Sequence, residues 1–100
     1  ERAKAFDGAC PLSPYVPADK LPGGNIHFTL DVNGQRQQTG DTDDMLNPIV
    51  PLISHMSKHF TLEPGDVVLT GTPKGVGPLV SGQTLSLELE DLLFVETHVV

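Results

Sequence analysis

The chain has 100 residues, a length that limits it to one domain. It carries 13 acidic and 6 basic residues, for a net charge of −7, and has no cluster of Lys and Arg that could displace counterions from nucleic acid. We therefore expect no nucleic-acid partner and no membrane partner, since no apolar run is long enough to span a bilayer. The lone Cys10 fits a reducing compartment, so we expect a cytoplasmic protein, or a mitochondrial one in a eukaryote.

The first segment with potential chemistry surrounds Lys4, which stands between two alanines and close to Phe6. A lysine in apolar surroundings can stabilise a developing enolate or bind a carboxylate. From the residues alone, a solvated surface lysine is the alternative. Prolines then interrupt regular structure as far as Gly23-Gly24, which predicts an irregular connector.

Residues 26–40 predict a β-hairpin. Apolar and polar residues alternate over residues 26–32, as in a strand with one buried face. Asn33-Gly34 is a favoured pair for a two-residue type I′ turn, and residues 35–39 would return as a polar edge strand. His27 falls on the polar face, where we expect it to be solvated.

Residues 41–60 predict the main helix, with Asn47 as a cap and Pro48 in the first turn. His55 and His59 are four residues apart, a spacing that lets two imidazoles bind one metal ion. The zinc-protease motif requires Glu directly after the first His, and Met56 stands there. We therefore expect no metal site at this pair.

Residues 67–70 form a β-branched apolar run that predicts a buried strand. A loop rich in Gly and Pro follows over residues 71–78, longer than a simple turn requires. Its backbone N–H groups and the Thr72 hydroxyl could bind a small anion, although the residues alone also fit a plain turn. The chain has no Gly-Lys pair for a P-loop, and its glycines lack the spacing of a dinucleotide-binding motif.

Two further strands are predicted near the C-terminus. After a turn at Ser81-Gly82, Leu85, Leu87 and Leu89 alternate along residues 84–90, and a last strand follows near residues 94–100. These elements together predict a β-rich α+β fold with one main helix.

Several segments together resemble the fumarylacetoacetate hydrolase family, and the match extends over essentially the whole chain. They are Ala3-Lys4-Ala5-Phe6-Asp7, Cys10-Pro11-Leu12-Ser13, Val32-Asn33-Gly34 and residues 62–78, which include Thr70-Gly71-Thr72-Pro73-Lys74-Gly75-Val76-Gly77-Pro78. The chain is most similar to short members that act as acylpyruvases and oxaloacetate decarboxylases. The resemblance implies a homodimer with a mixed β-sandwich roll, in which residues 1–100 would be the C-terminal portion of a single catalytic domain.

The resemblance also implies Mg²⁺- or Mn²⁺-dependent cleavage of a carbon–carbon bond in a 2,4-dioxo acid, and hence a small 2-oxo acid substrate. Lys4 stands where the family has the lysine that stabilises the enolate. Gly71, Thr72 and Pro73 stand where the family contacts the substrate carboxylate.

The family's metal ligands, a Glu-x-Glu pair and an Asp, precede that lysine. We therefore expect no metal ligand within residues 1–100, expect the ligands upstream, and expect the chain alone to be inactive. Glu88-Leu89-Glu90 has the Glu-x-Glu pattern but lies on a predicted strand near the C-terminus. We therefore do not assign the metal-ligand role to it. Two alternatives remain: isomerisation or decarboxylation of a 2-hydroxymuconate-like diacid, and a non-catalytic, dimer-forming remnant that binds a small anion.

Overall fold

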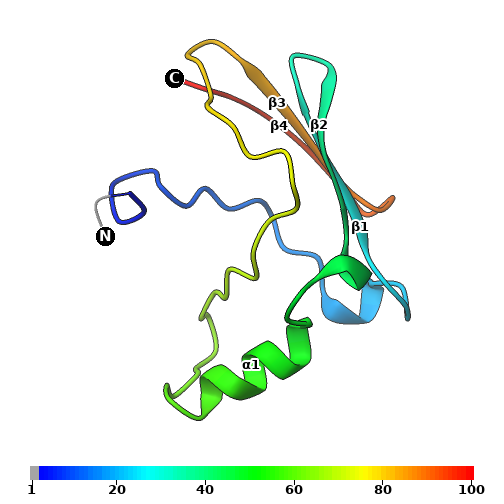
Figure 1. Cartoon of the computed structure of the whole chain (residues 1–100), viewed down its shortest axis with the longest axis vertical. Helices are drawn as coiled ribbons and strands as arrows, with labels where there is room; N and C mark the ends of the chain where they lie inside the picture. Colours follow the sequence, from blue (N-terminus) through cyan, green and yellow to red (C-terminus); the bar gives the residue numbers. More distant parts are fainter. Residues whose placement is uncertain (1–2) are drawn as a thin grey trace.

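A four-stranded antiparallel sheet dominates the computed structural model, which describes residues 3–100 (Figure 1). The strands, β1 (His27–Val32), β2 (Gln35–Asp41), β3 (Thr84–Leu89) and β4 (Leu93–His98), lie in the order β2-β1-β3-β4. One α-helix, α1 (Ile49–Ser57), and two short 3₁₀ turns, Ala18–Lys20 and Thr42–Asp44, complete the regular structure of this part of the chain. The α+β class with one main helix is confirmed.

The β1–β2 hairpin turns at Asn33 and Gly34, with φ of 51° and 80°. A type I′ turn requires positive φ at both central residues, and Asn and Gly tolerate this conformation best. The predicted hairpin and its turn are therefore confirmed.

The pairing of β1 with β2 contains a β-bulge. Val32 lies opposite Gln35 and Asp31 opposite Arg36, but Leu30 lies opposite Gln38. Gln37 is thus the extra residue, because a bulge sets two residues of one strand against one of its partner. As a result Gln38, and not Gln37, is the direct neighbour of Leu30.

The sheet has an apolar face that the described residues cover only in part. Phe28, Leu30 and Val32 of β1 lie opposite leucines of β3. Among residues 3–100 no hydrophobic side chain is fully buried, and Leu87 of β3 is 40% exposed. The buried residue of this region is Gly40, which lies directly under the ring of Phe28, its partner across the strands.

The predicted helix is correctly placed but shorter than expected. The Asp41 side chain accepts a hydrogen bond from the Asp43 N–H and caps a separate 3₁₀ turn. Pro48, and not Asn47, precedes α1, and it makes no side-chain cap. Its carbonyl accepts the Leu52 N–H at 3.0 Å, the first bond of the helix. No helix in residues 3–100 is long and apolar enough to cross a membrane.

The prediction of a buried strand over residues 67–70 is wrong. The segment has no strand pairing, and Val67 and Leu69 are 50% and 74% exposed. An extended segment becomes a strand only when a neighbour supplies ladder hydrogen bonds. The sheet ends at β2 and β4, and neither edge pairs with this segment within residues 3–100. Instead it runs as irregular chain between α1 and β3 (Figure 1).

Candidate anion-binding loop

The loop over residues 71–78 is held against β2 by the side chains of two consecutive glutamines. The Gln38 Nε2 group donates to the Thr72 Oγ1 atom and to the Pro73 carbonyl oxygen, both at 3.0 Å. The Gln37 Nε2 group donates to the Gly75 carbonyl oxygen at 2.8 Å. In all three bonds the loop supplies an oxygen acceptor and the strand supplies the donor.

Glycine at position 75 makes this close approach possible. Its φ is +105°, a conformation that other residues rarely adopt. A Cβ atom added there would overlap the backbone carbonyl oxygen of Gln37. The sequence therefore fixes both the path of the loop and its contact with the bulge.

The loop keeps its own donors unbonded. Within residues 3–100, no backbone N–H of residues 67–77 donates to a protein acceptor. The glutamines thus bond to loop oxygens and leave the loop N–H groups free. Successive backbone N–H groups of this kind form the usual protein site for a small anion. Anion binding by this loop stays a prediction.

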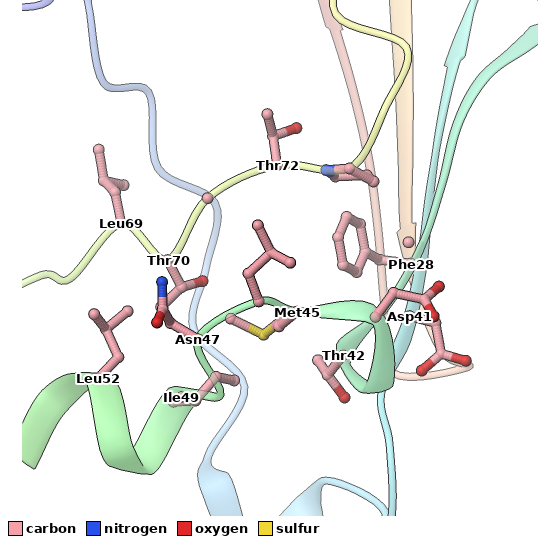
Figure 2. A pocket seen from close by; sticks show the side chains of 15 residues that line it. Phe28, Asp41, Thr42, Met45, Asn47, Ile49, Leu52, Leu69, Thr70 and Thr72 are labelled. Atoms are coloured by element: carbon pink, nitrogen blue, oxygen red, sulfur yellow. The ribbon is translucent and has the colours of Figure 1, made fainter.

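A depression of about 490 Å³ lies between this loop and the start of α1 (Figure 2). Apart from the loop itself, its lining is mainly apolar, but Asp41 and Asp44 also contribute carboxylates and no Lys, Arg or His lines it. Such a lining disfavours an anion. Thr70 points toward Asn47 on this side, whereas the Thr72 side chain leaves the other side of the loop ribbon (Figure 2). Thr72 is exposed and lines both this depression and a second one, which lies on the β2 side of the loop beside Gln37 and Gln38.

The predicted site residues do not all come together. Gly71, Thr72 and Pro73 are contiguous at the rim of the depression. Lys4 is exposed in the N-terminal turn and lines neither this depression nor the one on the β2 side of the loop. The role expected for Lys4 stays a prediction.

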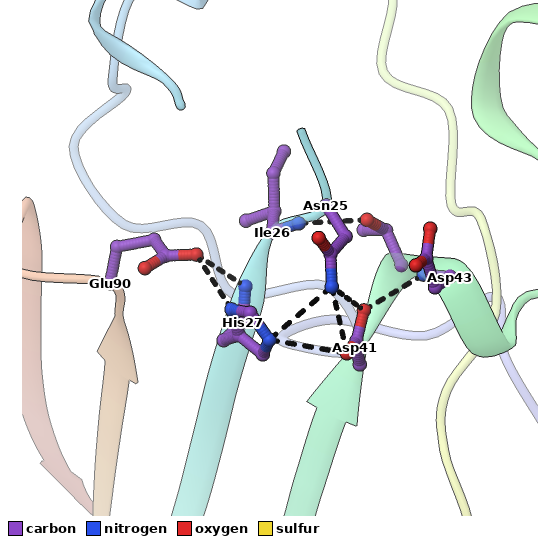
Figure 3. Close-up of polar contacts among 7 residues, drawn as sticks. Asn25, Ile26, His27, Asp41, Asp43 and Glu90 are labelled. Carbon is purple, nitrogen blue, oxygen red and sulfur yellow. Dashed lines mark hydrogen bonds and ion pairs between the residues drawn. The ribbon is translucent and has the colours of Figure 1, made fainter. Parts of the chain in front are cut away.

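A second polar cluster, which the sequence did not reveal, joins the ends of three strands (Figure 3). The His27 Nε2 atom lies 3.1 Å from Asp41 Oδ2, and its Nδ1 atom lies 3.2 Å from Glu90 Oε1. The hydrogen bond to Glu90, followed by the charge of Asp41, raises the pKa of His27 above 6.5. Hydrogen bonds from the Asn25 side chain and the Asp43 backbone lower the pKa of Asp41. His27 is exposed, as expected, but it is ion-paired rather than simply solvated.

The histidines of α1 and the following turn have no third potential metal ligand beside them among the described residues. The rings of His55 and His59 lie edge to face with centroids 5.2 Å apart, and both residues are exposed. No group of three or more His, Cys, Asp or Glu side chains within residues 3–100 could hold a metal ion. The described residues therefore do not fit the Mg²⁺ or Mn²⁺ ion that the resemblance implies.

Comparison with known proteins assigns the family. The family described as "Fumarylacetoacetate (FAA) hydrolase C-terminal" matches residues 1–100. This chain belongs to the fumarylacetoacetate hydrolase family. Oxaloacetate tautomerase YcgM of Escherichia coli is 55% identical over 92 residues, which cover 90% of this chain and 42% of that protein. The human mitochondrial oxaloacetate tautomerase FAHD1 is 42% identical over 92 residues, 91% of this chain and 42% of that protein.

Solved structures of the family share the fold. A fumarylacetoacetate hydrolase family protein of Yersinia pestis superposes with a TM-score of 0.93 at 47% identity, covering 99% of this chain and 46% of that one. The 5-carboxymethyl-2-hydroxymuconate delta-isomerase of Mycobacterium smegmatis gives a TM-score of 0.89 at 41% identity, covering 99% of this chain and 39% of that one. The chain thus spans less than half the length of these relatives.

Proposed function

We propose that the protein containing this chain interconverts the keto and enol forms of oxaloacetate, and that residues 71–73 bind one carboxylate of this substrate. The observation that carries the proposal is a loop with unbonded N–H groups around Thr72, in a chain 55% identical to an oxaloacetate tautomerase. An anion-binding loop held against β2 suits a small dicarboxylic acid.

The chemistry assigns separate tasks to the loop and to Lys4. The loop N–H groups and the Thr72 hydroxyl donate to the carboxylate next to the 2-oxo group, which fixes the orientation of C2 and C3. Tautomerisation moves a proton between C3 and the oxygen on C2, and negative charge develops on that oxygen. The Lys4 ammonium group donates to this oxygen and stabilises its charge. The base that takes the C3 proton is supplied from outside residues 3–100.

Mg²⁺ or Mn²⁺ remains part of the proposal as an expected cofactor. Since the described residues offer no set of ligands, the ion would be held by carboxylates from elsewhere in the protein. No step of the chemistry above depends on it.

Carbon–carbon bond cleavage is the second candidate activity. An oxaloacetate decarboxylase of Dictyostelium discoideum is 40% identical over 91 residues, 90% of this chain and 42% of that protein. Loss of CO₂ from oxaloacetate, or hydrolysis of an acylpyruvate, leaves the enolate of pyruvate. The same loop and the same lysine would serve these reactions, because the carboxylate and the charged oxygen occupy equivalent positions.

We further propose that the protein is a homodimer of the cytoplasm or the mitochondrion, without nucleic-acid or membrane partners. Large apolar side chains of this chain are strongly exposed, among them Leu46 at 98% and Val76 at 77%. Surfaces of this kind are normally covered by other protein. Light scattering of the purified protein tests the dimer, and a monomer at micromolar concentration would contradict it.

The test of the activity follows the ultraviolet absorbance of enol-oxaloacetate after it is mixed with the complete protein. The proposal predicts that the enol decays faster than it does spontaneously, with pyruvate formed no faster than in buffer. Rapid pyruvate formation would favour the cleavage activity. If the protein accelerates neither reaction, with Mg²⁺ or with Mn²⁺ present, both candidates are wrong.

A further inference from the structure

We propose that Gln38 is a positioning residue, which fixes the Thr72 hydroxyl as a hydrogen-bond donor toward the bound carboxylate. The inference rests on the proposed function, since it requires an anion at the loop. It assigns a task to a side chain of β2.

The direction of the Gln38 hydrogen bonds follows from its second partner. The Pro73 carbonyl oxygen can only accept, so the amide atom 3.0 Å from it must be the NH₂ nitrogen. The same nitrogen lies 3.0 Å from Thr72 Oγ1, and its second hydrogen points there. The Thr72 hydroxyl therefore accepts from Gln38, and its own proton must point elsewhere.

This constraint matters because a hydroxyl can either donate or accept. A carboxylate only accepts, so it needs the Thr72 proton and is repelled by the oxygen lone pairs. With one lone pair occupied by Gln38, the proton cannot point toward the Gln38 nitrogen and is left to donate to a ligand on another side of the hydroxyl. The donor is thus oriented before the ligand arrives, which lowers the cost of ordering it on binding.

The β-bulge at Gln37 places Gln38 under the loop. In an unbroken ladder from Val32 and Gln35, Leu30 would face Gln37, and Gln38 would lie on the opposite face. With the bulge, both glutamines reach the same loop, Gln37 through Gly75 and Gln38 through Thr72. Bulges are known to re-aim side chains near functional sites.

The test measures oxalate affinity by calorimetry in the complete protein with Mg²⁺ present. Gln38→Glu keeps the shape but offers an acceptor, which would draw the Thr72 proton toward the strand. We expect it to weaken oxalate binding by about tenfold to a hundredfold. Gln38→Met only frees the hydroxyl to rotate, so we expect a smaller loss, roughly threefold to tenfold.

Matched controls come from the neighbouring residue. Gln37→Met removes the other strand-to-loop bond without touching Thr72, and Gln37→Glu adds the same charge one residue away. We expect Gln37→Met to change the affinity less than about twofold, and Gln37→Glu to weaken it clearly less than Gln38→Glu. Thermal unfolding of each variant verifies that it is folded.

Two readouts separate positioning from simple support of the loop. In a Thr72→Val background, Gln38→Met should cause no further loss, because its effect acts through the hydroxyl. The deficit of Gln38→Glu, taken relative to the parent at each pH, should shrink as the pH falls toward the ordinary Glu pKa of about 4.3, where the carboxyl regains a proton to donate.

Additive losses in the double variant, or equal losses for the Gln37 and Gln38 variants, would overturn the inference and leave the proposed function intact. A parent protein that does not bind oxalate would instead overturn the proposed function, and the inference with it.

Discussion

Replacing Thr72 with valine removes one hydroxyl and keeps the shape of the side chain. Thr72 is exposed, and within residues 3–100 its hydroxyl makes one hydrogen bond, which it accepts from Gln38. Because water can replace that bond at an exposed site, the free energy of unfolding should fall by no more than about 1 kcal/mol. The fold should therefore survive the substitution.

The effect on ligand binding should be larger. A hydrogen bond to a charged acceptor contributes about 1.5–3 kcal/mol, which corresponds to roughly a tenfold to hundredfold loss in affinity for oxalate or pyruvate. Calorimetric titration of oxalate into the Mg²⁺-loaded complete protein measures this loss directly. The metal content should be unchanged, since a threonine is replaced and no group of three or more potential ligands lies within residues 3–100.

Thr70→Val is the matched control for this experiment. Thr70 is half-buried and points toward Asn47 in the depression beside α1, on the other side of the loop from the Thr72 side chain (Figure 2). We expect its replacement to change the oxalate affinity by less than about twofold. Equal affinities for Thr72→Val and the parent would mean that the loop only turns the chain.

Three further predictions test the surroundings of the loop. Lys4→Met should lower turnover by about 10²–10³-fold, the usual effect of removing one electrostatic contact to a developing charge, and should leave the melting temperature unchanged. A near-normal kcat would mean that Lys4 is only a surface residue. Gly75→Ala places a side chain at positive φ and against Gln37, at a cost of about 1–3 kcal/mol, so oxalate affinity should fall. Gly65→Ala is the control, because Gly65 has a similar φ but lies in open space, and the affinity should be unchanged. His27 has a raised pKa, so its stabilising effect is complete below pH 6.5 and is lost as the pH rises through the raised value. The melting temperature of the parent should consequently fall more steeply above pH 6.5 than that of His27→Gln, and identical slopes would show that the ion pairs do not stabilise the fold.

The sequence was sufficient to predict the elements that are specified by neighbouring residues along the chain. Asn33-Gly34 specifies its turn by backbone preference, and the apolar spacing from Ile49 to Met56 specifies the helical face. The loop of residues 71–78 could be recognised as a candidate site because its Gly and Pro content is unusual. None of these predictions depended on distant residues.

The features that the sequence missed depend on pairing between distant segments. Residues 67–70 have the composition of a strand, but composition does not supply a partner. The bulge at Gln37 shifts the register of the β1–β2 pair by one residue. This shift brings Gln38 to Thr72 and places His27 opposite Asp41. A regular hairpin would have placed His27 opposite Gly40, so neither contact could be derived from the turn alone.

The central claim is that the loop around Thr72 binds the carboxylate of a small 2-oxo acid. The most direct measurement is a crystal structure of the complete protein with oxalate bound. We predict a carboxylate oxygen about 2.5–2.7 Å from Thr72 Oγ1, with the backbone N–H groups of Gly71 and Thr72 directed at the same carboxylate. Oxalate bound without any contact to residues 71–73 would contradict the claim.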